Sequence, residues 1–481
     1  MSGLHERMSR VDTAWLRMDT PENLMMIVGV WLLSPRIELE ALRERVTERL
    51  LQYRRFKQRV VEDPMGAQWV DVPDFDVADH VIDVDLEPRK GQSRTEALKE
   101  HVASLTAEPL DQRLPLWQIQ LIQDVDGRSA MVSRIHHCIA DGIALISVML
   151  SITDGGLPPP KRRKKDPEEE HELDWLVDTL LKPVTNLTMQ AVRLTSKGMA
   201  KGMDAFLLPD HPMEGTLHMA KMGYQAMSDI TAFAMMPNDS PTRLKGKPAI
   251  AKRVAWNDDL ALDRVKLVGK ALGGSVNDVL LSCVAGAIGA YLHAKGDDPT
   301  GKEIRAMVPV NLRPMDKAYQ LGNRFGLVPL VLPIGIDNPA ERMYAVRARM
   351  HELKGSFQPI MAFGLLSVAG LLIKPVQHAM LGLFAKKATA VMTNVPGPQV
   401  PLKFCGSTVD KVMFWVPQSG DIGMGVSILT YAGKVQFGLI TDAGLCPDPQ
   451  AIVDRLGPEF DKLETLTLML PWGEDQLNTV R

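Results

Sequence analysis

Residues 157–174 (LPPPKRRKKDPEEEHELD) limit most strongly how this chain can fold. The segment joins a triple proline, five consecutive basic residues and an acidic block, a composition typical of a solvated linker or exposed loop. It divides the 481 residues into an N-terminal unit, 1–156, and a C-terminal unit, 175–481. The basic run could instead bind anionic lipid headgroups, but the adjacent glutamates would cancel most of that attraction.

Helix and strand patterns are mixed in both units, so we expect two α/β lobes. The clearest local signals are a capping box at 93–96 (SRTE) and two segments of alternating polarity around a turn. We predict helices over 38–51, after 93, over 143–152 and over 276–292, strands over 117–122, 129–136, 305–309 and 327–332, and a hairpin through 431–434.

Charge and cysteine content exclude several functional classes. With 55 Lys and Arg against 58 Asp and Glu the net charge is -3, so we expect no nucleic-acid partner. The four cysteines form no Cys-x-x-Cys pair, and the N-terminus is polar and charged. Both observations indicate a reducing, cytoplasmic location rather than secretion.

Two apolar features of the sequence bear on packing and surface. The segment 361–373 (MAFGLLSVAGLLI) is shorter than the ~18 residues of a spanning helix, so we expect a buried helix or one at a membrane interface. About a third of the 27 methionines lie within 189–236. That clustering suggests an adaptable apolar surface, with core filling as the alternative.

The segment 136–142 (HHCIADG) carries the chemistry and follows a predicted strand. Because side chains alternate along a strand, His136 and His137 should point to opposite faces, and only one of them can reach a given reacting group. The Asp141 carboxylate lies in the next turn, where it can hold the loop by pairing with an arginine. Two structural histidines or a zinc site are the alternatives, but no His or Cys cluster supplies a third zinc ligand.

The pattern His-His-x-x-x-Asp-Gly resembles the signature of CoA-dependent acyltransferases and of peptide-synthetase condensation domains. Its flanks are similar to bacterial wax ester synthase/diacylglycerol acyltransferases, over nearly the whole chain. Further blocks occur in that family's order: 9–12 (SRVD), 109–111 (PLD) with 115–117 (PLW), 275–279 (SVNDV), 308–313 (VPVNLR), 321–323 (LGN) and 393–398 (TNVPGP). Lys245 replaces a common Asn, and the 157–174 segment is more charged than usual; neither touches the motif.

The resemblance implies an α/β (α+β) fold of two chloramphenicol-acetyltransferase-like lobes with an interlobe active-site tunnel. Residues 1–156 would form the N-terminal acyltransferase lobe, 157–174 the charged linker, and 175–481 a helical connection and the C-terminal lobe. The implied function is O-acyl transfer of a long-chain acyl group from acyl-CoA to a fatty alcohol, a diacylglycerol or both. Transfer would be direct, within a ternary complex, with acyl-CoA as co-substrate and with no cofactor or metal.

Carried over to this sequence, the family's roles make His137 the general base, His136 its companion and Asp141 the residue that holds the loop. Gly142 would leave room for the substrate. An imidazole of pKa ~6.5 suits the removal of a hydroxyl proton during attack on a thioester.

Other residues are candidates around this centre. Asn277 and Asp278 are candidates for the oxyanion or substrate, although helix capping by Ser275 or Asn277 is an equal alternative. Arg313 is expected to pair with Asp141 across the lobes. Ala144 is either a wall of the pocket or simple core, and 393–398 should shape the channel.

Two other functions stay open at this point: a non-catalytic lipid-binding or droplet-associated protein of the same fold, and a condensation-type domain that uses carrier-protein thioesters. We expect a cytoplasmic protein, with peripheral association at the inner face of the plasma membrane or on lipid inclusions as the further expectation. The sequence does not predict the oligomeric state.

Overall fold

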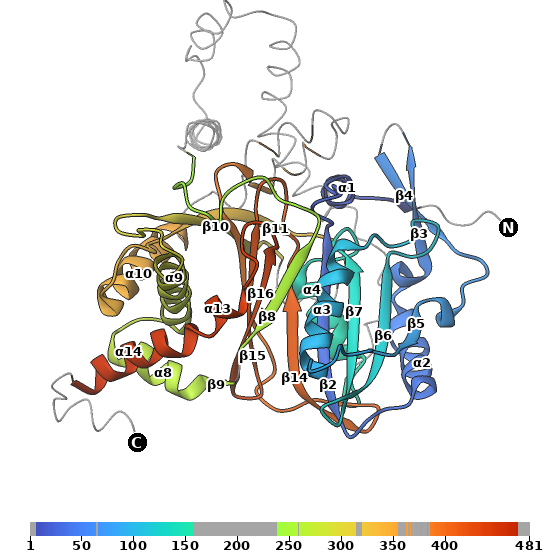
Figure 1. Ribbon diagram of the computed structural model, residues 1–481. Coiled ribbons are helices and arrows are strands. Elements are labelled where there is room, and N and C mark those ends of the chain that lie inside the picture. The colour runs from blue at the N-terminus through green and yellow to red at the C-terminus, as the bar shows by residue number, and fades with distance from the viewer. Residues whose placement is uncertain are drawn as a thin grey trace, which may run out of the picture.

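The computed structural model describes residues 6–63, 66–156, 238–257, 259–313, 320–354 and 386–469, with a few single residues between 362 and 385. The predicted linker at 157–174, the methionine cluster at 189–236 and most of 361–373 lie outside the described residues. The described chain forms two lobes, each built on one large sheet, that stand side by side (Figure 1).

The first lobe centres on a six-stranded sheet with the order β13-β14-β2-β7-β6-β5. Helix α3 covers one face, and α2 and α4 cover the other. A small sheet β1-β4-β3 adjoins it. The elements are β1 (Glu6–Arg7), α1 (Arg10–Arg17), β2 (Met26–Ser34), α2 (Leu39–Glu48), β3 (Gln58–Asp63), β4 (Gly66–Asp71), β5 (Val81–Val84), α3 (Arg94–Ala107), β6 (Trp117–Val125), β7 (Arg128–His136) and α4 (Gly142–Ser151).

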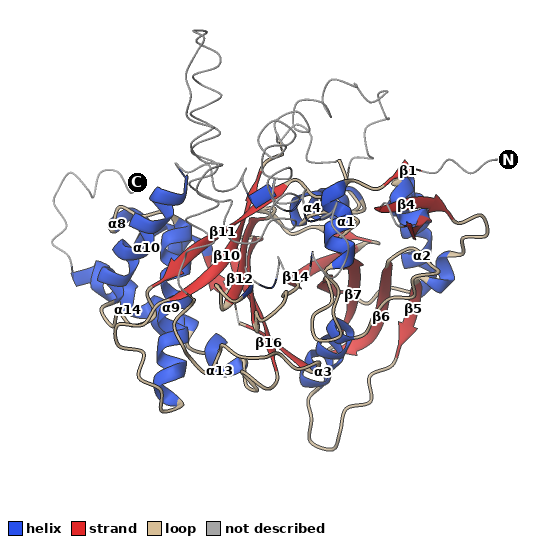
Figure 2. Cartoon of the chain, turned by 90° about the horizontal axis from the view of Figure 1, so that it is seen from above, coloured by secondary structure: helices blue, strands red, loops and turns tan. Residues whose placement is uncertain are grey.

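The second lobe has the strand order β11-β10-β12-β15-β16-β8, with β9 paired to β16. Its helices pack on one face of this sheet, and Figure 2 shows α8, α9, α10 and α14 on the outer side of the molecule. The elements are β8 (Lys252–Trp256), β9 (Leu260–Ala261), α8 (Leu262–Ala271), α9 (Val276–Ala294), β10 (Ile304–Asn311), β11 (Phe325–Leu332), α10 (Pro339–Lys354), β12 (Ala390–Pro396), β15 (Met424–Tyr431), β16 (Lys434–Asp442), α13 (Gln450–Val453) and α14 (Leu456–Met469).

Helix α9 is the axis of the second lobe. Of the described helices it is the one long and apolar enough to cross a membrane, but 78% of its apolar window is buried within the protein. The helix begins with a capping box in which Ser275 and Asp278 bond each other's backbone and side chain. It therefore packs as a core helix, with helices α8, α10, α13 and α14 around it.

One segment of the C-terminal unit belongs to the sheet of the first lobe. Strand β14 (Ser407–Trp415) runs antiparallel to β2, and β13 (Lys403–Phe404) extends the same edge. The sequence division at 157–174 is corrected here, because these residues complete the N-terminal lobe. Pairing between strands more than 370 residues apart, such as Thr408 with Ser34, leaves no local pattern in the sequence that would predict it.

The local predictions agree with the structure. The capping box at Ser93 and Glu96 starts α3, and the two strands of alternating polarity are β6 and β7. The predicted hairpin joins β15 to β16 with Ala432 and Gly433 at positive φ, as a two-residue turn requires.

We predict that the hydroxyl of Tyr431, in β15 of the second lobe, stabilises the position of β14 in the first sheet. It donates to the Val409 carbonyl at 2.7 Å and accepts from the Leu402 N–H at 2.8 Å. Tyr431→Phe should therefore lower the free energy of unfolding by about 1–3 kcal/mol, because both backbone groups lose a partner. Urea denaturation followed by circular dichroism measures the change.

The matched control is Tyr344→Phe on α10, where the ring is 47% exposed. Its denaturation midpoint should stay at the wild-type value. An equal loss of stability in both variants would show that the buried Tyr431 hydroxyl has no special role.

Candidate active site

The two histidines of the motif point to opposite sides of the first sheet, as predicted. Strand β7 ends at His136, and the His137 N–H bonds the Met25 carbonyl of the neighbouring segment at 2.7 Å. Ser133, Ile135 and His137 face a cavity between the lobes, and the His136 ring lies away from it.

The cavity has a volume of about 500 Å³ and is lined mainly by apolar side chains from both lobes. That volume lies within the roughly 300–1,000 Å³ typical of small-molecule sites. The first lobe contributes Trp15, Met25, Ile27, Trp31, Ile146 and Met149, and the second contributes Leu281, Val308, Phe325, Leu327, Met350 and Met392. The site is therefore complete only when the two lobes meet.

A divergence of two strands extends this cavity into the second lobe. Strands β10 and β12 pair only at Ala306–Ala390 and Met307–Val391, and beyond these residues both strands line the cavity. The predicted channel segment 393–398 lies here, along the wall. Asn277 and Asn394 also line the cavity, and the Asn394 amide donates to Asn277 Oδ1 at 2.6 Å.

The His137 imidazole packs against two aromatic rings. Trp15 from α1 stacks on it with a centroid distance of 4.2 Å and an interplanar angle of 14°, and Phe325 from β11 lies at 5.6 Å. Its Nδ1 atom has no hydrogen-bond partner among the described residues. Burial lowers the pKa of His137 to about 4, although the nearby Asp141 carboxylate and its own backbone carbonyl oppose this. The ring is therefore neutral at neutral pH and able to accept a proton.

The His136 ring is fixed by two bonds on the other side of the strand. Its Nδ1 accepts the Cys138 N–H at 3.1 Å, and its Nε2 lies 3.2 Å from the Asp19 carboxylate. Burial lowers the pKa of His136, but the Cys138 sulfur and the Asp19 carboxylate outweigh it, so the pKa is raised. Because Nδ1 accepts the Cys138 N–H, we assign a ring proton to Nε2, where it faces Asp19.

Asp141 joins the motif loop to the second lobe. Its carboxylate contacts the Arg313 guanidinium at 2.9 and 3.2 Å, and it also accepts the N–H groups of Ala144 and Arg324. The Asp141 and Arg313 side chains are 6% and 1% exposed. The predicted pairing across the lobes is thus present, and the same carboxylate caps α4.

Asp12 and Asn323 form a second connection beneath the motif. Asn323 Nδ2 donates to Asp12 Oδ1 and to the His137 carbonyl, both at 2.8 Å. Gly322, at φ +101°, bonds Ile139 and Asp141 through its backbone, and a side chain there would crowd Asp12. The 9–12 and 321–323 blocks therefore meet at the motif loop.

The remaining candidates separate clearly. Asp278 is corrected from a ligand candidate to a helix cap, because its carboxylate turns back to the Ser275 N–H and hydroxyl. Ala144 is fully buried in the hydrophobic core and does not line the cavity. A Cβ on Gly142 would meet no atom within 4 Å, so the glycine leaves open space at the cavity wall.

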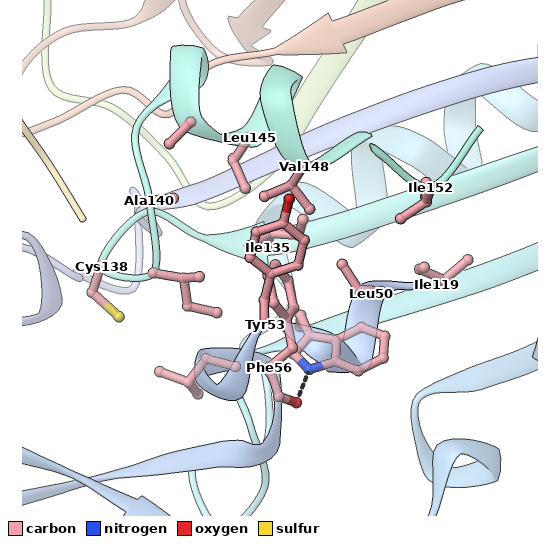
Figure 3. Close-up of a cluster of buried hydrophobic side chains, with 14 of the residues drawn as sticks. Leu50, Tyr53, Phe56, Ile119, Ile135, Cys138, Ala140, Leu145, Val148 and Ile152 are labelled. Atoms are coloured by element: carbon pink, nitrogen blue, oxygen red, sulfur yellow. Dashed lines mark hydrogen bonds between the residues drawn. The ribbon is translucent and has the colours of Figure 1, made fainter. Parts of the chain in front are cut away.

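The motif loop is also anchored by its apolar residues. Cys138 and Ala140 lie against the cluster formed by Ile135, Leu145 and Val148, which Figure 3 shows in close-up. Below them, the Trp117 indole of the 115–117 block donates to the Phe56 carbonyl at 2.8 Å. This packing anchors the motif loop, and the His137 ring faces the cavity.

Sequence reasoning missed three contacts that shape this site: Trp15 and Phe325 on the His137 ring, and Asp19 at His136. Trp15 follows the 9–12 block by one helical turn, which was the available signal. No group of three His, Cys, Asp or Glu side chains within the described ranges could hold a metal ion.

Comparisons with known proteins agree with this architecture. The family model "Wax ester synthase/diacylglycerol acyltransferase catalytic domain" matches residues 8–280, and "WS/DGAT C-terminal domain" matches 321–464. A protein of Mycobacterium tuberculosis named a probable diacylglycerol O-acyltransferase is 26% identical over 454 residues, which is 92% of each chain.

Two solved structures share the fold. The wax ester synthase/diacylglycerol acyltransferase from Marinobacter aquaeolei VT8 has a TM-score of 0.63 at 19% identity, over 96% of this chain and all of that one. The first condensation domain of the calcium-dependent antibiotic synthetase has a TM-score of 0.58 at 12% identity, over 98% and 97% of the two chains. At these identities the likeness establishes the two-lobed fold alone.

We predict that removing Arg313 costs more than a surface charge would. Arg313→Met leaves the Asp141 carboxylate buried without its cation, which should lower the free energy of unfolding by about 3–5 kcal/mol. Chemical denaturation of the purified variant measures this.

Arg113→Met is the matched control, since that guanidinium is 88% exposed in its pair with Asp111. Its stability should equal that of the wild type within error. A small effect of Arg313→Met would mean that water or another cation replaces the guanidinium.

Proposed function

This chain belongs to the wax ester synthase/diacylglycerol acyltransferase family and is an acyltransferase, and we propose that it moves a long-chain acyl group from acyl-CoA to the hydroxyl of a diacylglycerol, a fatty alcohol or both. The observation that carries the proposal is a buried, neutral His137 that faces an apolar cavity enclosed by both lobes. The mycobacterial relative is named a probable diacylglycerol O-acyltransferase, and this name favours the diacylglycerol acceptor.

The chemistry assigns His137 the role of general base. As the acceptor hydroxyl attacks the thioester carbonyl, the imidazole takes its proton, the new C–O bond forms, and the carbonyl electron pair moves to oxygen. Collapse of this tetrahedral intermediate breaks the C–S bond, and the departing CoA thiolate recovers the proton from His137. No acyl-enzyme is needed. Such a base contributes roughly 10²–10⁴-fold, and alignment of the two substrates adds to that.

The developing oxyanion needs a hydrogen-bond donor, and Asn277 is our candidate. Its side chain lines the cavity and is not the helix cap, because Ser275 and Asp278 take that role. The bond from Asn394 to Asn277 Oδ1 occupies the acceptor side of the amide. The Asn277 N–H groups are the part of the side chain that would serve an oxyanion.

The environment of the site suits uncharged lipids. Aliphatic and methionine side chains dominate both walls, so they can bury acyl chains of different shape. We propose acyl-CoA as co-substrate without a cofactor, and a cytoplasmic protein that meets its acceptor at the inner face of the plasma membrane or on lipid inclusions. A net charge of -3 fits an uncharged acceptor and purely local contacts to the CoA phosphates.

Release of CoA tests the proposal directly. Purified protein is incubated with palmitoyl-CoA and either dioleoylglycerol or hexadecanol, and free thiol is followed with time. We expect acceptor-dependent release, and a fall of roughly 10²–10⁴-fold in His137→Ala. The ratio of the two acceptors measures the preference for triacylglycerol or wax ester.

His101→Ala is the matched control, because this histidine of α3 bonds Gln120 of β6 and does not line the cavity. It should keep wild-type activity. No release with either acceptor would overturn the proposed pair of acceptors, and full activity in His137→Ala would exclude His137 as the base.

The pKa of His137 also predicts the pH dependence of kcat/KM. A base with a lowered pKa is neutral and active above that pKa, and it is lost as the pH falls through it. With a pKa of about 4, kcat/KM should stay level from pH 8 to about pH 5 and decline only below that. A decline already centred near the ordinary value of ~6.5 would show that burial does not control the base.

A further inference from the structure

We propose that Trp15 and Phe325 form an aromatic clamp that positions the His137 imidazole and shields it from water, in the place that an orienting carboxylate takes in many histidine-based sites. The inference rests on the proposed role of His137 as the base. Trp15 and Phe325 are therefore positioning residues, one supplied by each lobe.

The geometry of the ring supports the clamp. Trp15 stacks nearly parallel to the imidazole, and Phe325 lies against it at a tilt of 46°. The two aromatic rings also contact each other, with centroids 5.5 Å apart, so they lie on adjacent sides of the imidazole. Contact with two rings restricts rotation of the imidazole about its side-chain bonds, and this packing helps to define where its nitrogen atoms point.

No carboxylate orients the imidazole among the described residues. In a Ser-His-Asp site the acid bonds Nδ1 of the histidine, but here Nδ1 is without a partner in the described chain. Asp141 contributes only its charge, since its oxygens are engaged by Arg313 and by backbone N–H groups. Asp19 binds the other histidine.

Helix α1 is itself firmly held, so that it can act as a support. Ser9 caps it, and one turn before Trp15 the buried Asp12 carboxylate accepts two bonds from Asn323. Next to Trp15 in the same helix, the Ala14 carbonyl accepts a bond from Gln377 Nε2 at 2.9 Å. Trp15 therefore holds the ring of His137, and Asp12, one turn earlier in the same helix, holds the His137 carbonyl through Asn323.

The other half of the clamp comes from the second lobe. Phe325 begins β11, directly after Asn323 and Arg324, whose backbone bonds Asp12 and Asp141. Closure of the lobes therefore sets the clamp and the Asp141–Arg313 pair together. The base is aligned only when the cavity is assembled.

The experiment measures the ionisation of His137 directly. Protein labelled with ¹³C at histidine Cε1 is titrated, and the His137 resonance is assigned by its loss in His137→Gln. We expect Trp15→Ala and Phe325→Ala to raise the pKa of His137 by one to two pH units, from about 4 toward ~6.5, because water reaches the ring. The acid limb of kcat/KM should move by the same amount, with kcat at pH 8 reduced roughly 10- to 100-fold.

Trp15→Phe tests stacking apart from hydrogen bonding. The Trp15 indole N–H is buried without a partner among the described residues, so Phe keeps an aromatic face and removes no bond. This variant should retain a pKa and an acid limb close to those of the wild type. If Trp15→Ala folds poorly, Phe325→Leu is the variant that removes an aromatic ring, and Trp15→Phe is the variant that keeps one.

The matched control is Phe75→Ala at His80, a buried histidine that stacks on both Phe75 at 5.0 Å and Trp117 at 4.5 Å, outside the cavity. It should leave the His137 titration unchanged. The ionisable groups around His137, namely His136, Asp141, Asp12 and Arg313, are present in every variant, so a shift in the His137 pKa reports the lost aromatic ring.

Two outcomes separate the clamp from the function. An unchanged His137 pKa in folded Trp15→Ala and Phe325→Leu would overturn the clamp and leave both rings as core. A raised pKa in a protein that releases no CoA would support the clamp while the proposed acyl transfer fails.

Discussion

The buried contact between Asp141 and Arg313 is the interaction on which the rest of the site depends. A carboxylate and a guanidinium taken out of water gain little net stability, because the loss of hydration offsets their attraction. What the contact contributes is a fixed orientation of one lobe relative to the other. Asp141 caps α4 in the first lobe, while Arg313 and the Arg324 N–H come from the second, so one carboxylate fixes how the lobes meet. Breaking this alignment would open the cavity as well as the loop.

The pair also explains how a buried base can stay neutral so close to an acid. An isolated carboxylate beside His137 would favour the imidazolium and raise its pKa. Here the Arg313 charge balances Asp141, and the burial of the ring is the larger influence. The two groups of the motif therefore have different roles. Asp141 is charged and forms the ion pair that holds the structure, whereas His137 is uncharged and can accept a proton.

Local chemistry explains which features could be predicted from the sequence. The capping boxes at Ser93 and Ser275, the hairpin at Ala432 and Gly433, and the opposite directions of His136 and His137 follow from neighbours a few residues apart. The Asp141–Arg313 contact could be expected because two charged residues stood in two matching blocks. Strand β14 beside β2, and Phe325 on the His137 ring, depend on how distant segments pack, which periodicity does not encode.

The divergence of β10 from β12 affects which substrates the cavity can accept. A continuous sheet would close the second lobe, since every backbone group along both strands would be paired. Two paired positions hold the strands together at one end, and the diverging ends open a passage lined by Val308, Met392 and Met350. The base belongs to the first lobe and this passage to the second. Substitutions along the passage can therefore change which chain is accepted while the His137 loop stays intact.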